Sequence, residues 1–296
     1  MLSILIPSYN FDVRKLVHQL HQQGVLLRVP FEIICIEDAS LQKYVDLNQS
    51  INALSFVTHR VLSNNLGRSK IRNYLATQAH YDYLLFMDCD SMPVSNAYLS
   101  NYIEQIHPKQ LLYGGRCYQE QAPNDLTLYF HWYYGKHREQ SIAKDRQKNS
   151  YQSFMTNNFL IPKDLFESIR FEETLTQYGH EDTLFGLELQ EKRIPILHID
   201  NPLEHIGLEP NHVFLKKSEL AIQNLYILHT KHSVHKEIKL LHFFLQTKRL
   251  YLHFPILIIY FFTKILLKKN LFSRLPQLTL FDFYKLGYLI QWTKKQ

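Results

Sequence analysis

The sequence contains few cysteines: three in 296 residues, namely Cys35, Cys89 and Cys117. So few cysteines, so far apart, exclude a disulfide framework and a cysteine-rich metal cluster. Cys35 and Cys89 lie in apolar segments that predict strands, so we expect them to be reduced residues of a buried core. Internal repeats, low-complexity tracts and a signal peptide are also missing. These absences lead us to expect a cytoplasmic chain.

No charged residue occurs from Leu250 to Thr263, but this apolar run is too short to cross a membrane. It covers fourteen residues, whereas a spanning helix needs about 20. Lys264, Lys268 and Lys269 follow it, and composition turns apolar, aromatic and basic after about Thr230. We therefore predict a helical C-terminal region, residues 231–296, that binds the anionic inner face of a cell membrane as a peripheral protein. The alternative is a helical subdomain packed on the rest of the chain.

The overall composition indicates a folded protein with a mild basic excess. A hydrophobic content of 46% is enough for a large core, so we expect a folded chain and not a disordered one. The net charge of +6 is compatible with nucleic acid, an anionic membrane or a phosphate-bearing substrate. Composition alone does not choose among these partners.

The first hundred residues alternate between strand and helix patterns. Apolar runs such as "SILIP", "FEIICIED", "FVTHRVL" and "YDYLLFMD" predict strands, and "DVRKLVHQLHQQG" and "GRSKIRNYLATQAH" predict helices between them. Repeated strand–helix–strand units predict an α/β domain with a mostly parallel sheet, which we assign to residues 1–230. Residues 119–150 are aromatic, polar and poorly periodic, so we expect a long loop or lid there.

Polar residues stand where four predicted strands end, and this edge is where parallel α/β sheets bind ligands. "SYN" ends the first strand, Asp38 the second and "SNNLG" the third. Asp88 and Asp90 end the fourth, in "LLFMDCDS". Two carboxylates separated by one residue suit Mg²⁺ or Mn²⁺, which also binds substrate phosphates. The simpler alternative is a solvated turn.

Two further segments place charge at predicted helix starts. In "NLGRSKIRN", Gly67 precedes Arg68 and Lys70, which lie in the first turn, where the helix dipole disfavours cations unless an anion binds. In "GHEDTLFG", Glu181 and Asp182 either stabilise the helix dipole or include a general base. Position alone does not show whether the basic residues of the first segment bind an anion or only face solvent. Nor does it show whether the acids of the second segment are catalytic or only stabilise the helix dipole.

The order of these segments, with "NNFLIPKDLF" and "HIGLE" after them, resembles family 2 glycosyltransferases of the GT-A fold over roughly residues 1–230. The "GHED" segment also resembles the "GGED" element of chondroitin polymerase and the β-1,4-galactosyltransferases. The resemblance implies a GT-A fold with a C-terminal helical extension. It implies an inverting transferase that moves a sugar from a nucleotide sugar, expected to be a UDP-sugar, in bacterial surface polysaccharide synthesis.

The resemblance also implies roles for residues that bind the donor and a metal ion. Mn²⁺ or Mg²⁺ would be held by Asp88, Asp90 and His205 and would bridge the donor phosphates. The other residues expected to contact the nucleotide sugar are Pro7, Tyr9, Asn10, Asp38, Arg68 and Arg72, together with Asp88. Family members often carry two aspartates where this chain has Glu37 and Asp38.

The remaining roles concern the acceptor group, which we expect to be a hydroxyl of a glycan or lipid-linked acceptor. Glu181 would orient this hydroxyl and Asp182 would deprotonate it. Asn157 and Asn158 match the family's loop near the acceptor. We expect no nucleic-acid partner. Two other functions stay open from sequence: a nucleotidyltransferase, although "SYNFDVRK" lacks that class's glycine-rich loop, and a non-catalytic sugar-binding module.

Overall fold

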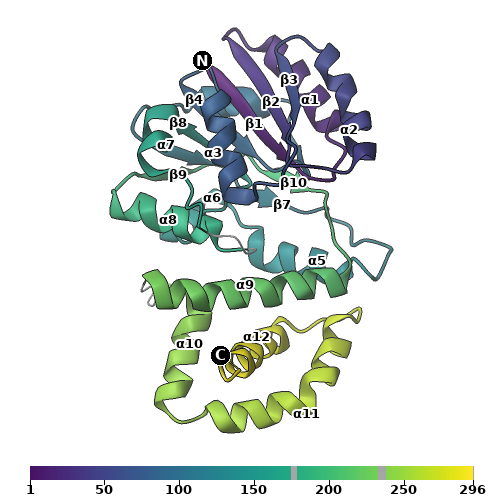
Figure 1. The fold of residues 1–296 in the computed structure, drawn as a ribbon, viewed down its shortest axis with the longest axis vertical. Coiled ribbons are helices and arrows are strands. Elements are labelled where there is room, and N and C mark those ends of the chain that lie inside the picture. Colours follow the sequence, from purple (N-terminus) through teal and green to yellow (C-terminus); the bar gives the residue numbers. More distant parts are fainter. Residues whose placement is uncertain (175–178, 233–237, 296) are drawn as a thin grey trace. The chain divides into compact units, whose positions relative to one another are not determined.

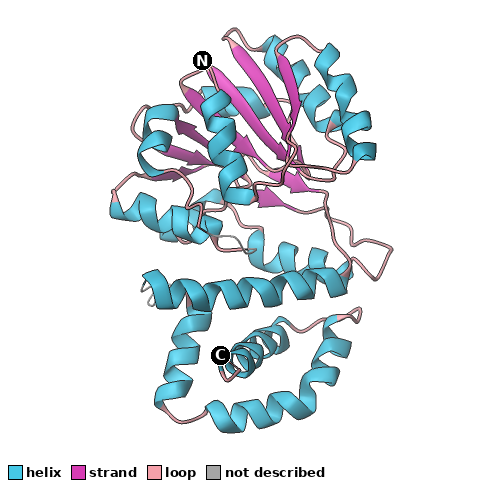
Figure 2. Cartoon of the chain, in the orientation of Figure 1, coloured by secondary structure: helices cyan, strands magenta, loops and turns pink. Residues whose placement is uncertain are grey.

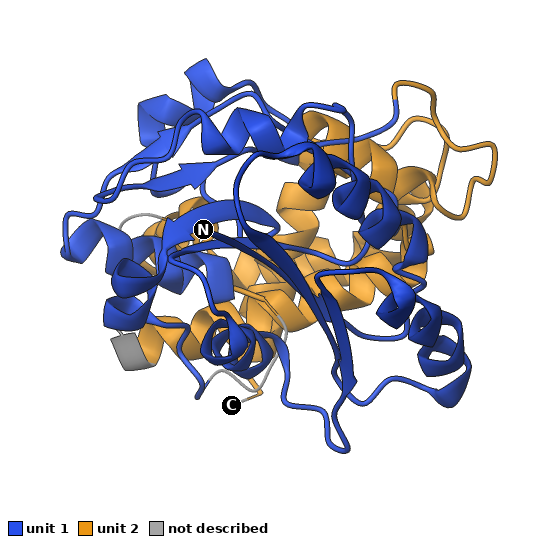
Figure 3. Cartoon of the chain, turned by 90° about the horizontal axis from the view of Figure 1, so that it is seen from above, with its two compact units in different colours: residues 1–119, 139–176, 181–207 blue, residues 120–138, 177–180, 208–296 orange. Residues whose placement is uncertain are grey.

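The computed structural model of the chain describes residues 1–174, 179–232 and 238–295, with side chains described up to residue 230 and again from 238. The chain divides into two compact units (Figure 3). Unit 1 comprises residues 1–119, 139–176 and 181–207, and unit 2 comprises residues 120–138, 177–180 and 208–296. The domain boundary predicted near Lys231 stays a prediction.

Unit 1 is built on a seven-stranded sheet with the order β3-β2-β1-β4-β8-β6-β9 (Figures 1 and 2). β8 runs antiparallel to both its neighbours, and the other pairs are parallel, as a mostly parallel α/β sheet requires. The strands are β1 (Leu2–Ser8), β2 (Phe31–Glu37), β3 (Val57–Val61), β4 (Tyr83–Met87), β6 (Leu111–Tyr113), β8 (Asn158–Pro162) and β9 (Ile196–His198).

A second, three-stranded sheet has the order β5-β10-β7. Its strands are β5 (Ser91–Pro93), β7 (Arg116–Cys117) and β10 (Leu203–His205). β5 follows β4 almost directly, and the antiparallel pairing of β10 with β5 sets His205 opposite Ser91. This small sheet therefore places His205, the first residue of "HIGLE", beside Ser91, the last residue of "LLFMDCDS".

Helices cover both faces of the large sheet, which explains why its central strands are apolar on both sides. On β1, Leu5 faces one core with α3, α7 and α8, while Ile4 and Ile6 face the other with α1, α4 and η1. The helices of unit 1 are α1 (Arg14–Leu26), α2 (Gln42–Asn48), η1 (Gln49–Ala53), α3 (Arg68–Gln78), α4 (Tyr98–Ile103), α6 (Ala143–Arg146), η3 (Gln147–Asn149), α7 (Lys163–Ile169) and α8 (Glu181–Glu191).

The described part of unit 2 is helical, with its own core. Tyr260 and Tyr284 lie at its centre, with ring centroids 5.5 Å apart, and both side chains are fully buried. No single helix in the described ranges is long and apolar enough to cross a bilayer, and α10 and α11, which pass that test together, are bent by 119°. Its helices are α5 (Tyr129–Tyr134), α9 (Asn211–His232), α10 (Lys239–Arg249), α11 (His253–Leu271) and α12 (Leu278–Thr293).

The expectation of a long loop over residues 119–150 is wrong. This segment contains α5, a turn of π-helix (Gly135–Glu139), α6 and η3. α5 is stabilised by packing rather than by periodicity: Phe130 is fully buried, and its ring lies 5.5 Å from that of Phe214 and 5.0 Å from that of Phe281. Helices of three to six residues are too short to show a helical repeat in sequence.

Candidate active site

The carboxyl ends of β1, β2, β3 and β4 lie along one edge of the large sheet, as predicted. The parallel register pairs Ser8 with Glu37 and Glu37 with Val61, so the strands end level with one another. The polar residues that follow the strands therefore gather at this edge. All the site residues predicted from sequence belong to unit 1.

Asp38 holds the loop that precedes α3. Its Oδ1 accepts the backbone N–H of Leu66 at 2.6 Å and its Oδ2 accepts that of Gly67 at 3.0 Å. Gly67 has φ of +82°, in the left-handed region where a residue without a Cβ is least strained. The sharp turn and the carboxylate together set the direction in which α3 leaves the sheet edge. Burial raises the pKa of the Asp38 carboxyl in spite of these two hydrogen bonds.

Glu37, the residue before Asp38, is fully buried and structural. It accepts hydrogen bonds from Ser40, from Asn48 Nδ2 at 2.6 Å and pairs with His59 Nε2 at 3.3 Å. Burial would raise the pKa of Glu37, but these partners outweigh it and lower the pKa below its usual value. A residue so enclosed supports the strand end instead of meeting a ligand.

Pro7, Tyr9 and Asn10 form the end of β1 and the turn after it. Pro7 is half-buried, and the Tyr9 side chain is exposed. Asn10 adopts φ of 54° and is held in place, since its Oδ1 accepts the backbone N–H of Leu41 at 2.8 Å. Tyr9 is thus the member of this trio with an aromatic face open to a base or ribose.

The first two turns of α3 connect the two acidic motifs. Arg68 Nη1 donates to Glu181 Oε1 at 3.0 Å, and one turn later Arg72 Nη2 donates to Asp88 Oδ1 at 2.6 Å. The Arg72 side chain is almost completely buried, whereas about half of the Arg68 side chain is exposed. Both arginines are therefore balanced by carboxylates, and part of the Arg68 side chain is exposed to solvent.

Sequence patterns did not identify Arg116, which is a third guanidinium at this edge. Its Nη2 lies 3.4 Å from Asp88 Oδ2, and its Nη1 donates to Glu139 Oε2 at 3.0 Å. Tyr118 also donates to Glu139. These residues come from the two-residue strand β7, the residue just after it and the end of a π-helical turn, where no periodic signal exists. Asp88 is thus flanked by Arg72 and Arg116.

Asp90 and His205 form the second charged pair. His205 Nδ1 lies 3.5 Å from Asp90 Oδ1, and the backbone N–H of Ile206 donates to the Asp90 carbonyl at 2.9 Å. Gly207 must be small here, because a Cβ on it would lie 2.6 Å from Asp90 Cβ. Burial would raise the pKa of Asp90, but the hydrogen bond and charge of His205 and the charges of Arg116 and Arg68 hold it well below its usual value.

These side chains fit a divalent cation at Asp90 and His205 better than at Asp88. A carboxylate oxygen and an imidazole nitrogen are both accepted by Mn²⁺, and this pair already lies side by side. Both oxygens of Asp88 instead face guanidinium groups. Within the described ranges no group of three or more His, Cys, Asp or Glu residues has metal-binding geometry, so the remaining ligands would be substrate phosphates or water.

Glu181 and Asp182 begin α8 and have opposite electrostatic environments. Burial would raise the pKa of Glu181, but the charges of Arg68 and Arg72 outweigh it and lower that pKa. Burial, and then the charge of Glu181, raise the pKa of Asp182 to about 6. Arg68 and Arg72, one turn apart on α3, pair with Glu181 and with Asp88, so the Glu181–Asp182 acids and the Asp88–Asp90 acids belong to one site in unit 1.

Asn157 and Asn158 differ in their capacity to bind a ligand. Asn158 uses all four of its hydrogen-bonding positions: Oδ1 accepts from Tyr98 and Tyr102 hydroxyls, and Nδ2 donates to the carbonyls of Gly115 and Asn201. Asn157 is also buried, but its Nδ2 has no partner in the described structure. Of the two, Asn157 alone keeps a donor for an acceptor or a water.

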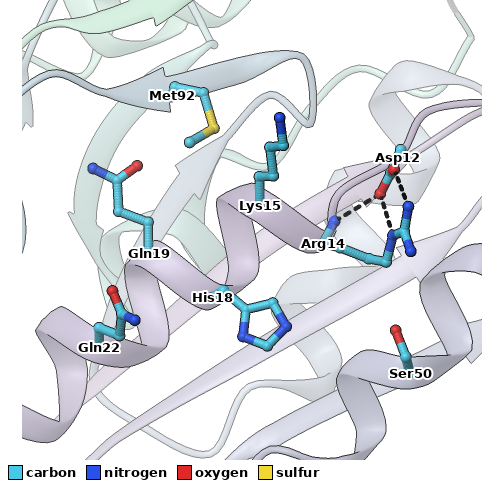
Figure 4. A pocket seen from close by; sticks show the side chains of 8 residues that line it. All are labelled: Asp12, Arg14, Lys15, His18, Gln19, Gln22, Ser50 and Met92. Carbon is cyan, nitrogen blue, oxygen red and sulfur yellow. Dashed lines mark hydrogen bonds and ion pairs between the residues drawn. The ribbon is translucent and has the colours of Figure 1, made fainter.

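A separate open pocket of about 570 Å³ lies along α1 (Figure 4). It shares no residue with the predicted site. Arg14 in its wall is paired with Asp12 in the same wall, at 2.7 Å between Nη2 and Oδ2. The lining residues are Asp12, Arg14, Lys15, His18, Gln19, Gln22, Ser50 and Met92.

Comparisons with known proteins agree with this fold. A sequence model described as glycosyl transferase family 2 matches residues 3–170, more than half of the chain. No curated protein matches the chain in sequence. The mannosyltransferase PcManGT from Pyrobaculum calidifontis, solved with GDP-Man and Mn²⁺, is similar in structure, with a TM-score of 0.61 and 12% identity over 99% of this chain and 86% of that one.

S. aureus TarS is a second structural neighbour. Its TM-score is 0.50 at 18% identity, and the match covers 77% of this chain and 39% of TarS. The chain thus spans well under half of that protein's length. At such identities both neighbours establish the fold alone.

Proposed function

The chain belongs to glycosyl transferase family 2, and from that premise we propose that unit 1 transfers a sugar from a UDP-sugar to a hydroxyl of a glycan or lipid-linked acceptor. The observation that carries the proposal is that α3 joins the two acidic motifs: Arg68 pairs with Glu181 at 3.0 Å and Arg72, one turn later, pairs with Asp88 at 2.6 Å. A donor diphosphate and an acceptor hydroxyl would each meet the groups they require in one site.

Asp182 is suited to act as the general base. With a pKa of about 6 it is ionised at neutral pH, yet it is basic enough to take a proton from a hydroxyl as that hydroxyl attacks. The acceptor oxygen would bond to the anomeric carbon, the bond to the diphosphate would break, and the hydroxyl proton would pass to Asp182. One such displacement inverts the anomeric configuration.

Glu181 and Arg68 would position the acceptor and the diphosphate. The ion pair of Glu181 with Arg68 fixes the carboxylate next to Asp182, where its oxygens can accept a hydrogen bond from the acceptor. About half of the Arg68 side chain is exposed, so its guanidinium could approach a donor phosphate. A divalent cation held by Asp90 and His205 would supply further charge for the leaving diphosphate.

The donor base is the finer part of the proposal. Family resemblance favours uridine, whereas PcManGT was solved with GDP-Man and TarS residues 1–349 with UDP-GlcNAc. The first of these neighbours is 12% identical and the second has a TM-score of 0.49, so neither decides the base. Tyr9, with its exposed ring, is the residue we assign to stack on the base or contact the ribose.

A donor screen tests the proposal. The purified chain is incubated with Mn²⁺ and single UDP- or GDP-sugars, and the released nucleoside diphosphate is measured with and without glycan or lipid-linked acceptors. We expect release from at least one UDP-sugar, and faster release with a suitable acceptor. Release of pyrophosphate from a nucleoside triphosphate and a sugar phosphate, without any diphosphate release, would contradict the proposal in favour of nucleotidyl transfer.

A further inference from the structure

The solvent-facing side of α11 is apolar. Seven residues at helical spacing share it: Phe254, Ile258, Ile259, Phe261, Phe262, Ile265 and Leu266, here called the α11 apolar face. The opposite side of the helix, with Tyr260, Leu267 and Leu271, is already buried in the core of unit 2. The exposed side of a helix in a water-soluble protein is ordinarily polar. In α11 the exposed side is apolar as well, and no other described part of the chain buries it.

The exposure of this face is large for side chains of this type. Phe262 is 75% exposed, Ile265 70% and Phe261 69%. The turn before α11 continues the pattern, because Leu250 is 60% exposed and Tyr251 90%. Scattered exposed apolar residues are normal, whereas a contiguous patch of large ones marks an interaction surface.

Basic residues stand at both ends of the α11 apolar face. Lys248 and Arg249 precede it, Lys269 and Arg274 follow it, and all four are exposed. Residues 238–296 contain ten Lys and Arg but one acid, Asp282. That acid is engaged within unit 2, where it pairs with Arg138 at 2.6 Å and with Lys285 at 2.9 Å. The surroundings of the face therefore carry a net positive charge.

Two of the lysines expected from sequence to contact a membrane instead contact residues of unit 2. Lys264 lies over the ring of Tyr260, 5.5 Å from its centroid. Lys268 lies 5.8 Å from the centroid of Tyr284 and 4.0 Å from Glu219. Lys269 and Arg274 are consequently the better probes of charge at this end of the face.

We propose that the α11 apolar face and the turn before it bind the surface of an anionic lipid bilayer, with α11 lying in the plane of the interface. Phenylalanine, isoleucine and leucine side chains would enter the acyl boundary, and the flanking Lys and Arg would meet lipid phosphates. A second copy of the chain is the less suitable partner. Two such faces pressed together would bring only basic residues into contact at their rims, and like charges repel.

Vesicle cosedimentation of the full chain tests the proposal. The vesicles contain phosphatidylcholine alone or phosphatidylcholine mixed with phosphatidylglycerol, at low and at high salt. We expect the wild type to bind the anionic vesicles at least tenfold more tightly than the neutral ones, and high salt to remove most of that difference. Equal binding to both vesicle types, or none to either, would overturn the proposal.

Phe262→Asp probes the apolar contribution, with Leu26→Asp as its matched control. Leu26 is 81% exposed at the end of α1 in unit 1, so both changes place an acid at an exposed apolar site. Phe262→Asp should weaken binding to anionic vesicles at least tenfold, and Leu26→Asp less than twofold. An unchanged melting temperature and unchanged diphosphate release show that Phe262→Asp remains folded. Equal losses in both variants would overturn the assignment.

A charge reversal separates lipid charge from apolar contact. Lys269→Glu with Arg274→Glu should abolish the preference for phosphatidylglycerol and leave weak binding to phosphatidylcholine unchanged. Lys109→Glu with Lys144→Glu, at exposed positions of unit 1, should do neither. Light scattering of the same proteins measures whether the chain is a dimer. A dimer that Phe262→Asp dissociates, together with absence of vesicle binding, would assign the face to a second copy and overturn the lipid proposal.

Discussion

His205 Nδ1 lies 3.5 Å from Asp90 Oδ1, although the two residues come from distant parts of the chain. The antiparallel pairing of β10 with β5 brings them together, because His205 is opposite Ser91 in that ladder. The pair is therefore set by backbone hydrogen bonds and does not depend on a flexible loop. A carboxylate and an imidazole so placed are the first two ligands of the cation site that we assign.

Removing either member of this pair should weaken metal binding. We expect Asp90→Asn and His205→Ala each to lower Mn²⁺ affinity by at least tenfold, and diphosphate release to fall with it, because each change removes one of the two protein ligands that we assign. Titration calorimetry with Mn²⁺ measures the affinity directly. Asp145→Asn, at an exposed acid of α6, is the control and should change nothing. Wild-type affinity in Asp90→Asn would refute the ligand assignment.

Gly207→Ala should impair the same site without touching a ligand. The new Cβ would lie 2.6 Å from Asp90 Cβ and 2.7 Å from Asp90 Oδ2, so the carboxylate must move. Displaced supporting contacts typically cost roughly 10–100-fold in metal affinity, and we expect a loss in that range. Ile206→Ala, at the neighbouring and more exposed position, serves as the control. Equal affinities in both variants would show that Asp90 adapts freely.

The pH dependence of turnover should report Asp182. Because burial and the charge of Glu181 raise its pKa to about 6, kcat/KM should fall as the pH drops below about 6. In Glu181→Gln the neighbouring negative charge is gone, which favours ionisation of Asp182 and lowers its pKa. The acid limb of the pH profile should therefore move to lower pH in this variant. A limb that stays in place, or moves up, would assign it to another group.

Asp182 should also make the folded protein less stable at neutral pH. The pKa of its carboxyl is about 6 in the folded protein against an ordinary value of 3.8, so the unfolded chain loses this proton first. The free energy of unfolding therefore decreases as pH rises from about 4 to about 6, by up to about 3 kcal/mol. Asp182→Asn should melt several degrees above the wild type at pH 7, and the difference should shrink toward pH 4.

That comparison has a simple control and a clear contrary result. Asp145→Asn removes an acid whose ion pair with Lys148 is exposed and therefore contributes little, so its melting temperature should stay close to that of the wild type at both pH values. Asp182→Asn melting below the wild type at pH 7 would show that the ionised carboxylate stabilises the fold, contrary to the environment described here.

The parts of the site that sequence predicted are those carried by regular elements. Continuous apolar runs identify buried strands, and residues after parallel strands must meet at one edge, which located Asp38, Asp88 and Asp90. The cations at the start of α3 suggested a balancing anion. In the structure the carboxylates of Glu181 and Asp88 balance Arg68 and Arg72.

The parts that sequence missed depend on contacts between segments without periodicity. Arg116 lies in a two-residue strand and Glu139 at the end of a π-helical turn, so nothing local distinguishes them from surface charges. Asn158 looked like a ligand contact beside Asn157, but four partners from distant segments saturate it. Only the tertiary structure separates a satisfied asparagine from one with a donor to offer.

The assignment of Asp182 as the base is tested by turnover and donor binding measured side by side in wild type and Asp182→Asn. We expect the wild type to release a nucleoside diphosphate from a nucleotide sugar in the presence of its acceptor. We expect Asp182→Asn to lose at least ~10²-fold in rate while binding the donor with wild-type affinity, since the amide keeps the shape but takes up no proton at neutral pH. A variant that retains more than about a tenth of the wild-type rate would contradict the assignment of Asp182 as the base.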